Sequence, residues 1–166
     1  MTAQTTLELG AETSTLECIE DGQVVLQHSL PLGTASLARQ WMRHTPPTPL
    51  DMEHAIEQTE DVVMPLASKL VRTDQLLMRG SGAALILQAV GAKPDEALLW
   101  GLDEVEVFFN RIAMVSQGRP SGQEALPTAP EFYAAMVILR ECLHHLRFVK
   151  DTLHNSLDCV LDVSPA

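Results

Sequence analysis

Two turns that contain glycine have the residue types for binding phosphate. The segment Gly10 to Ser14 follows an apolar run, and Gly80-Ser81-Gly82 lies between a second apolar run and a helix-like one. Glycine lets backbone N–H groups approach an anion closely, because no Cβ intervenes, and a helix amino terminus adds a favourable dipole. The sequence therefore predicts weak phosphate binding by Gly10, Thr13, Ser14, Gly80, Ser81 and Gly82.

A second group with chemical potential is the pair Glu141 and His144, which has the Glu-x-x-His spacing that di-iron sites use in helical bundles. Such sites require two of these pairs and two further glutamates. Residues 54–61, the other cluster of histidine and acidic residues, have the reversed order. The simpler interpretation is that Glu141 and His145 form an i,i+4 pair on a solvated helix face, with His144 packing at its edge. A metal site is the weaker alternative.

Basic residues gather around this pair in an otherwise acidic protein. They are Arg140, His144, His145, Arg147 and Lys150. Such an island either lies on a solvated face or receives an anion or an acidic partner helix. The solvated face is the simpler interpretation.

Length and composition predict a single globular domain that spans residues 1–166. Of the 166 residues, 46% are hydrophobic and 20% are charged, which favours a folded core over disorder. No apolar run approaches the ~20 residues that a membrane span needs. The amino terminus lacks signal-peptide features, so we expect a cytoplasmic protein. The net charge of -11 disfavours nucleic acid as a partner.

The cysteines do not indicate a redox or metal motif. Cys18, Cys142 and Cys159 are odd in number and have no CxxC spacing. We interpret them as reduced, mostly buried side chains, and predict neither a disulfide framework nor a zinc knuckle. The sequence also indicates no Ser-His-Asp or Cys-His arrangement.

Hydrophobic periodicity and turn residues predict the elements that position these groups. Asp21-Gly22 joins two strands by a tight hairpin turn, since both residues tolerate positive φ. Thr34 is the predicted N-cap of one helix, and Pro65 is expected to kink or break the next helix near Met64. The predicted elements are strands 5–9, 13–20 and 23–29, helices 34–44 and 49–70, strand 75–78, helices 83–90, 103–117 and 130–146, strand 148–152 and a short element ending at 159–161.

The predicted helix 103–117 is apolar on more than one side, which favours burial in a larger body or contact with a partner. The residues responsible are Val107, Phe108, Phe109 and Met114. The apolar face of the predicted helix 130–146 is widened by Ala134, Val137 and Ile138. We expect the two helices to share a homodimer interface or to contact a heteromeric protein partner.

The order of elements and motifs resembles the second half of the core of the exopolyphosphatase/guanosine pentaphosphate phosphatase family, within the actin-like superfamily. That family's Asp-(Ile/Leu)-Gly-Gly-Gly-Ser-x-Glu corresponds here to Glu8-Leu9-Gly10-Ala11-Glu12-Thr13-Ser14-Thr15. Its Ser-x-x-x-Gly-x-x-x-Leu stretch is matched by Ser29, Gly33 and Leu37, and its Gly-x-Ser-Gly-Thr turn by residues 79–83. Its Gly-Val-Leu ending is matched by residues 159–161, with cysteine in place of glycine.

The resemblance implies one α/β subdomain of ribonuclease H-like, actin-like ATPase topology. A three-stranded antiparallel start is followed by strands that helices connect, over residues 4–162. Gly33 becomes a further phosphate-binding position, and Glu8 becomes a ligand for Mg²⁺.

The same resemblance implies that catalysis has been lost. Ala11 and Glu12 replace two of the three loop glycines, and a glutamate facing the cradle would repel phosphate. The two catalytic carboxylates of the family correspond to Glu8 and Thr15, and threonine cannot act as a general base. We therefore assign no catalytic residue.

The sequence thus predicts a non-catalytic phosphatase-like lobe that acts as an interaction or regulatory module. It would self-associate or complete a complex, with weak phosphate or nucleotide binding. The alternative is a phosphatase or phosphohydrolase acting on polyphosphate or a nucleoside polyphosphate, with its cleft completed by a second subunit. In that case Glu8 binds the metal, while Thr13, Ser14 and Ser81 contact phosphate.

Overall fold

The structure is a computed structural model that describes residues 2–70, 73, 75–93, 97–148 and 150–153, the last four by their backbone alone. The strands are β1 (Ala3–Leu9), β2 (Ser14–Glu20), β3 (Gln23–Leu30), β4 (Gln75–Arg79), β5 (Leu98–Gly101) and β6 (Lys150–Leu153). The helices are α1 (Thr34–Trp41), α2 (Pro49–Val63), the 3-10 turn η1 (Met64–Leu66), α3 (Ser81–Ala89), α4 (Leu102–Ser116), α5 (Ser121–Glu124) and α6 (Pro130–His145).

The strands form one mixed sheet in the order β3-β2-β1-β4-β6-β5. β1, β2 and β3 are antiparallel neighbours, whereas β4 lies parallel to β1 and β6 lies parallel to β4. The predicted three-stranded antiparallel start, followed by strands reached through helices, is confirmed. The chain is therefore a mixed α/β lobe.

The hairpin between β2 and β3 has the predicted turn. Asp21 and Gly22 have φ values of 48° and 81°, and Glu20 pairs directly with Gln23. A two-residue turn with positive φ at both positions matches the right-handed twist of the flanking strands. The local sequence therefore determines the register of this part of the sheet.

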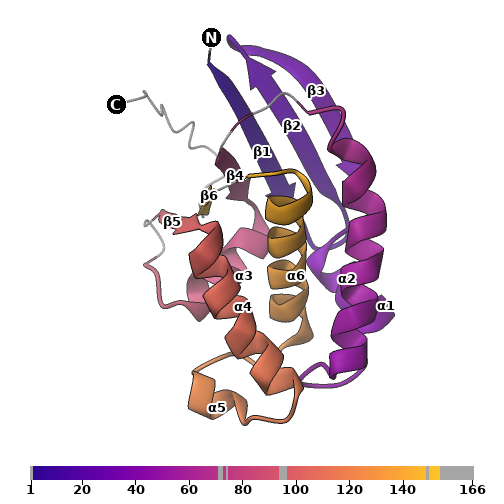
Figure 1. Ribbon diagram of the computed structural model, residues 1–166, viewed down its shortest axis with the longest axis vertical. Helices are drawn as coiled ribbons and strands as arrows, with labels where there is room; N and C mark the ends of the chain where they lie inside the picture. The colour runs from indigo at the N-terminus through magenta and orange to yellow at the C-terminus, as the bar shows by residue number, and fades with distance from the viewer. Residues whose placement is uncertain (1, 71–72, 74, 94–96, 149, 154–166) are drawn as a thin grey trace.

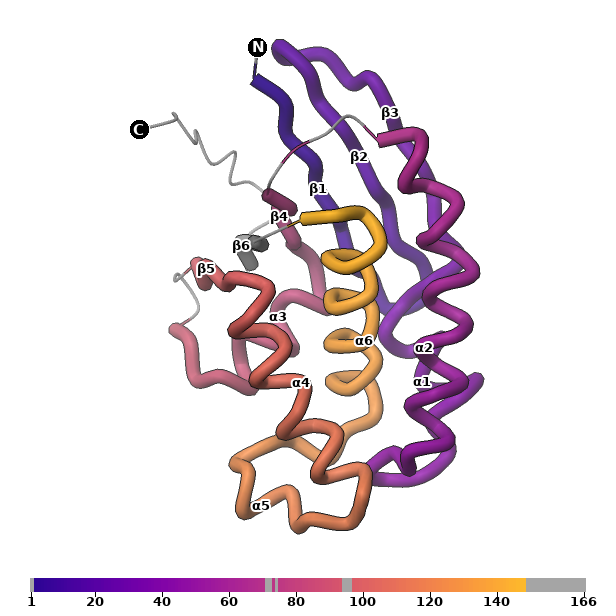
Figure 2. Tube along the Cα trace, in the orientation of Figure 1, coloured from indigo at the N-terminus to yellow at the C-terminus, as the bar shows by residue number. Residues whose placement is uncertain are grey.

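Helix α6 is the centre of the helical layer. It lies between α4 on one side and α1 and α2 on the other (Figures 1 and 2), and it contacts α1, α2, α3 and α4. Every residue from Phe132 to Leu139 is buried, because neighbours surround this helix on all sides. Among the described residues, no helix is long and apolar enough to cross a membrane.

Helix α2 begins at the predicted residue 49 and is interrupted at the predicted break near Met64, so it is shorter than the predicted range 49–70. Thr48 accepts a hydrogen bond from the Asp51 amide at 3.2 Å, and the Asp51 carboxylate accepts one from the Thr48 amide at 3.1 Å. This capping box satisfies two backbone donors that the helix itself leaves unpaired. The helix ends at Val63, and Pro65 lies in the 3-10 turn that follows.

Three local predictions differ from the structure. Gly33, rather than Thr34, is the N-cap of α1, and Thr34 is its buried first residue. The predicted loop 118–130 contains the single-turn helix α5, and residues 98–101 form the unpredicted strand β5. A four-residue run has too little alternation to indicate a strand, so β5 depends on its pairing with β6. The predicted element at 159–161 lies outside the described residues.

Candidate functional site

The two predicted phosphate-binding turns meet at one edge of the sheet. β1 and β4 are parallel, and Glu8 is paired in register with Arg79, so the turns that follow both strands lie at their shared carboxyl-terminal edge. A Cβ on Gly82 would lie 2.3 Å from the side chain of Leu9, and one on Gly80 would lie 2.8 Å from the Leu9 carbonyl oxygen. Both glycines are therefore required for the close approach of β1 to the start of α3.

Glu8 lies between a threonine and an arginine. Its partner in β2 is Thr15, and Arg79 Nη2 lies 3.4 Å from Glu8 Oε2. The Nε atom of Arg79 is buried and has no hydrogen-bond partner in the described part of the chain. This edge of the sheet therefore combines one half-exposed carboxylate with a cation, and Thr15 adds no second carboxylate.

The loop after β1 is bound to the start of α1 through its carbonyl groups. The Thr34 amide donates to Gly10 O at 3.0 Å, and the amides of Ala35 and Ser36 donate to Ala11 O at 2.8 and 3.1 Å. A Cβ on Gly33 would lie 2.3 Å from Ala11 O. Gly33 thus serves close packing here, and the opening amides of α1 are already occupied.

The sequence leaves the direction of the Glu12 side chain open, and the structure decides it. Both oxygens of its carboxylate accept hydrogen bonds from Arg39 on α1, at 3.2 and 2.8 Å. The hydrogen bond from Arg39 lowers the pKa of Glu12, and both side chains are more than half exposed. A cation therefore pairs with this charge in the folded chain, which reduces the repulsion of phosphate that a glutamate facing the cradle would cause.

The backbone amides of the two turns lack the hydrogen-bond acceptors that the first amides of α1 have. Those of Ala11, Glu12 and Thr13 donate to no acceptor among the described residues. The amides of Ser81, Gly82 and Ala83 are likewise without an acceptor in the described part of the chain. Consecutive free amides and a helix amino terminus are features that bind anions. This edge of the sheet thus has free backbone N–H donors in both turns, which lie on either side of Leu9.

The predicted ligand residues differ in accessibility. Thr13 and Ser81 are exposed, and Gly10 and Gly80 are half-buried. Ser14, in contrast, is 3% exposed and its hydroxyl donates to Leu32 O at 2.6 Å, which occupies it inside the protein. Gly33 and Gly82 are buried. The structure therefore brings all seven predicted residues to one region but leaves four of them accessible.

Three members of the predicted basic island, Arg140, His144 and His145, pair with carboxylates inside the chain, whereas Arg147 is exposed and forms no ion pair with the described residues. Arg140 Nε lies 3.0 Å from Glu106 Oε1, which His144 also contacts, and Arg140 Nη1 lies 2.7 Å from Glu141 Oε1. Partial burial opposes ionisation of Glu106, but hydrogen bonds from His144 and Arg140 lower its pKa.

The predicted Glu141–His145 pair is present, with 3.2 Å between Nε2 and Oε2. Glu141 is only 2% exposed, so its assignment to a solvated face was wrong. Glu60 on α2 joins this pair, at 3.1 Å from His145 Nε2. The sequence analysis includes Glu60 in the second cluster, at residues 54–61, but it could not predict this contact across 85 residues.

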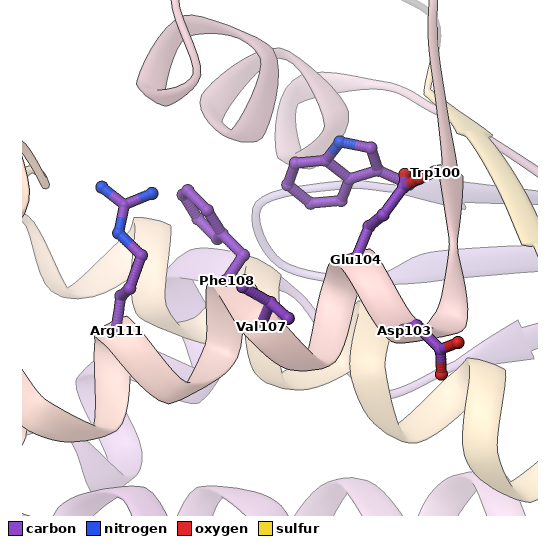
Figure 3. Close-up of a pocket in the computed structure, with 6 residues that line it drawn as sticks. All are labelled: Trp100, Asp103, Glu104, Val107, Phe108 and Arg111. Atoms are coloured by element: carbon purple, nitrogen blue, oxygen red, sulfur yellow. The ribbon is translucent and has the colours of Figure 1, made fainter.

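The apolar surface predicted for helix 103–117 is smaller in the folded chain. Phe108 and Phe109 are buried, and so are Ala134, Val137 and Ile138 of α6, so these five residues present no apolar surface to a partner. Val107, 65% exposed, remains on the surface of α4. Figure 3 shows the shallow hollow beside it, whose lining is Trp100, Asp103, Glu104, Val107, Phe108 and Arg111.

Comparison with known proteins identifies the fold. No family model and no curated protein matches the sequence. The Aquifex aeolicus Ppx/GppA phosphatase (type II variant) superposes with a TM-score of 0.73 at 14% identity, over 92% of this chain and 53% of that one. An exopolyphosphatase from Cytophaga hutchinsonii superposes with a TM-score of 0.62 at 16% identity, again over 92% and 53%. The chain thus has the fold of a Ppx/GppA lobe and spans about half the length of these structures.

Proposed function

We propose that this chain is a non-catalytic phosphatase-like lobe that binds a phosphate-bearing ligand weakly and acts by associating with protein. One observation supports the absence of catalysis. Glu8 and Glu12, the two carboxylates of the segment 8–15, are both paired with arginines, and Thr15 lies opposite Glu8. A general base must be free to accept a proton from the attacking water. Neither carboxylate is free in this way, so the edge favours binding without hydrolysis.

Retention of phosphate binding is supported by the free amides on both sides of Leu9 and by Arg79. Arg79 is the last residue of β4, and among the described residues Glu8 is the one carboxylate paired with its guanidinium. The Arg39 side chain removes the one charge that would oppose an anion at the first turn. Backbone donors without a strong catalytic group suit recognition of a phosphate or nucleotide.

Association with another chain is supported by the comparisons. The matched fold is about half of each Ppx/GppA structure, and this chain presents the corresponding sheet edge with exposed turn residues. A second copy of this chain or a different protein that covers the edge would give the two-sided cleft in which ligands are usually buried. The regulatory role would then consist of ligand binding that changes this association.

The alternative is a phosphatase whose cleft a second subunit completes. Two observations favour it: Glu8 is 44% exposed, and the Glu12 charge is neutralised. A divalent cation could compete with Arg79 for the Glu8 carboxylate, with Mg²⁺ the predicted ion. The missing general base would have to come from the partner.

The decisive experiment combines thermal unfolding with an assay of phosphate release. The purified chain is mixed with excess Mg²⁺ and ATP, guanosine pentaphosphate or polyphosphate. Ligand at 100 times its Kd should stabilise the fold by about 2.7 kcal/mol, and no inorganic phosphate should appear. Release that is lost in Glu8→Gln would establish the alternative. Absence of any thermal shift would refute ligand binding.

Association is tested separately by size-exclusion chromatography with light scattering. A homodimer supports self-association. A monomer that forms a stoichiometric complex with a purified partner supports the heteromeric form. A strict monomer for which no partner is found would contradict the interaction role.

A further inference from the structure

Three metal-ligating side chains converge at the opposite edge of the parallel strands from the two turns. Glu60 comes from α2, and Glu141 and His145 come from the last turn and a half of α6. Their ligand atoms all lie within 4.8 Å of one another. β6 starts five residues after His145 and runs parallel to β4, which places this end of α6 at the amino-terminal edge of the parallel strands. The cluster therefore forms no part of the phosphate-binding edge.

The distances in this cluster are those of a coordination site. His145 Nε2 lies 3.1 Å from Glu60 Oε1 and 3.2 Å from Glu141 Oε2. Ligand atoms around a tetrahedral ion, each at about 2.1 Å from it, lie about 3.4 Å apart. Small side-chain adjustments would therefore admit an ion between the three groups. The i,i+4 spacing of Glu141 and His145 holds two ligands on one helix face.

The electrostatics of the cluster favour a divalent cation. Glu141 is 2% exposed, so its carboxylate has lost most of its hydration, and the Glu60 carboxylate lies close to it. A cation between the two carboxylates would relieve both effects, because it compensates lost hydration and replaces repulsion by attraction. The negative end of the α6 dipole is also here, since the helix ends at His145.

The surrounding residues orient the buried ligand. Arg140 Nη1 lies 2.7 Å from Glu141 Oε1, so the other oxygen, Oε2, is the one presented to His145. Arg140 is itself held by Glu106, at 3.0 Å. Outer hydrogen bonds of this kind fix the geometry of metal ligands. Glu60 and His145 are about one-third exposed, which leaves a path for the ion from solvent.

We propose that Glu60, Glu141 and His145 bind one divalent first-row transition ion, with Zn²⁺ preferred and the remaining position taken by water. One imidazole and two carboxylates form a ligand set that zinc accepts, and zinc binds such sites more tightly than Mn²⁺. The ion connects α2 to the end of α6. Its role is therefore to stabilise the contact between these two helices, independently of phosphate binding.

The test is calorimetric titration of the metal-free chain with Zn²⁺, with Mn²⁺ titrated in parallel. We expect one Zn²⁺ per chain, weaker Mn²⁺ binding, and an increase in Tm on addition of Zn²⁺. His145→Gln and Glu60→Gln should each weaken Zn²⁺ binding at least tenfold. The matched control is His144→Gln, one residue away, whose side chain contacts Glu106 instead, and it should retain the wild-type affinity within about twofold.

Co²⁺ provides a readout of geometry, because a four-coordinate site gives a far more intense visible absorption than a six-coordinate one. Absence of saturable Zn²⁺ binding would overturn the proposal, and so would binding that His145→Gln leaves unchanged. If His145→Gln does not fold, the Zn²⁺ affinity of Glu60→Gln provides the test, since Glu60 is partly exposed on α2 and its substitution should leave the fold intact. Equal loss of binding in His144→Gln would assign the ion to another site and also overturn the proposal.

Discussion

Arg39 holds both carboxylate oxygens of Glu12, at 3.2 and 2.8 Å, across 27 residues of sequence. Glu12 occupies a position where the phosphatase motif has glycine, and its charge is the main feature of the sequence that opposes an anion there. The bidentate pair neutralises that charge and draws the side chain toward α1. The charge at the first turn therefore depends on an arginine outside the motif.

Arg39→Ala should weaken phosphate binding. Removal of the cation leaves the Glu12 carboxylate unpaired beside the free amides, so we expect a lower affinity for ATP by about tenfold, at unchanged fold. Because the pair is exposed, Tm should change little. Fluorescence or calorimetric titration measures the affinity. Arg43→Ala is the control, since Arg43 is exposed and forms no ion pair among the described residues. An equal loss of ATP affinity in Arg43→Ala would show that the loss comes from the change in net charge and not from the Glu12–Arg39 pair.

Gly82→Ala should destabilise the fold. The new Cβ would lie 2.3 Å from Cγ of Leu9, a side chain that is fully buried and cannot move aside. Overpacking of this kind costs about 1–3 kcal/mol, measurable by urea unfolding. Gly122→Ala is the matched control, because a Cβ there meets nothing within 4 Å. Equal stability of the two variants would contradict the close packing of β1 against α3.

Asp51 should make the free energy of unfolding depend on pH in the acid range. Burial opposes ionisation, but hydrogen bonds from Thr48 and His44 outweigh it and lower the pKa of Asp51. A carboxyl with a lowered pKa in the folded state stabilises the fold above its unfolded pKa of about 3.9, and this stabilisation is lost as pH falls through the folded value.

Asp51→Asn should therefore be less stable at neutral pH and show a flatter decline below about pH 4, as measured by urea unfolding across that range. Asp61→Asn is the control, because Asp61 is exposed on the same helix. The same acid dependence in wild type and Asp51→Asn would rule out this role.

Cys142 should be unreactive in the folded protein. Burial, with a smaller contribution from the charge of Glu141, raises the pKa of this thiol to about 12. The thiolate is the reactive form, so alkylation with iodoacetamide at pH 8 should leave Cys142 unmodified. Mass spectrometry after labelling in urea provides the positive control. Labelling of Cys142 under native conditions would indicate that this part of α6 opens.

Val107→Asp should reduce any self-association of the chain. Val107 is 65% exposed beside the hollow on α4, and a charge there disfavours an apolar contact. Light scattering across a concentration series measures the effect. Val24→Asp, 56% exposed on β3, is the control for the general effect of an added charge. Equal changes in both variants would exclude α4 as the contact surface.

Much of the fold follows from short-range sequence signals. The Asp21-Gly22 turn, the cap at Thr48 and the proline at 65 each act within a few residues, so the hairpin and α2 were predicted correctly. Strand β5 was not, because four residues carry almost no periodicity and it forms only where β6 provides hydrogen-bond partners. The two glycine turns could be located from the sequence, since glycine and serine mark the ends of strands, but phosphate binding there stays a prediction.

The sequence by itself determined that this chain forms a phosphatase-like α/β lobe with two glycine-containing turns and with threonine, not a carboxylate, at position 15. Only the tertiary structure decided the charge state of those turns, through Arg39, and the approach of Glu60 to Glu141 and His145. Local patterns reflect neighbours along the chain, whereas electrostatic and coordination energies depend on distances across it. Residues that lie 27 or 85 positions apart meet only when the helices have packed.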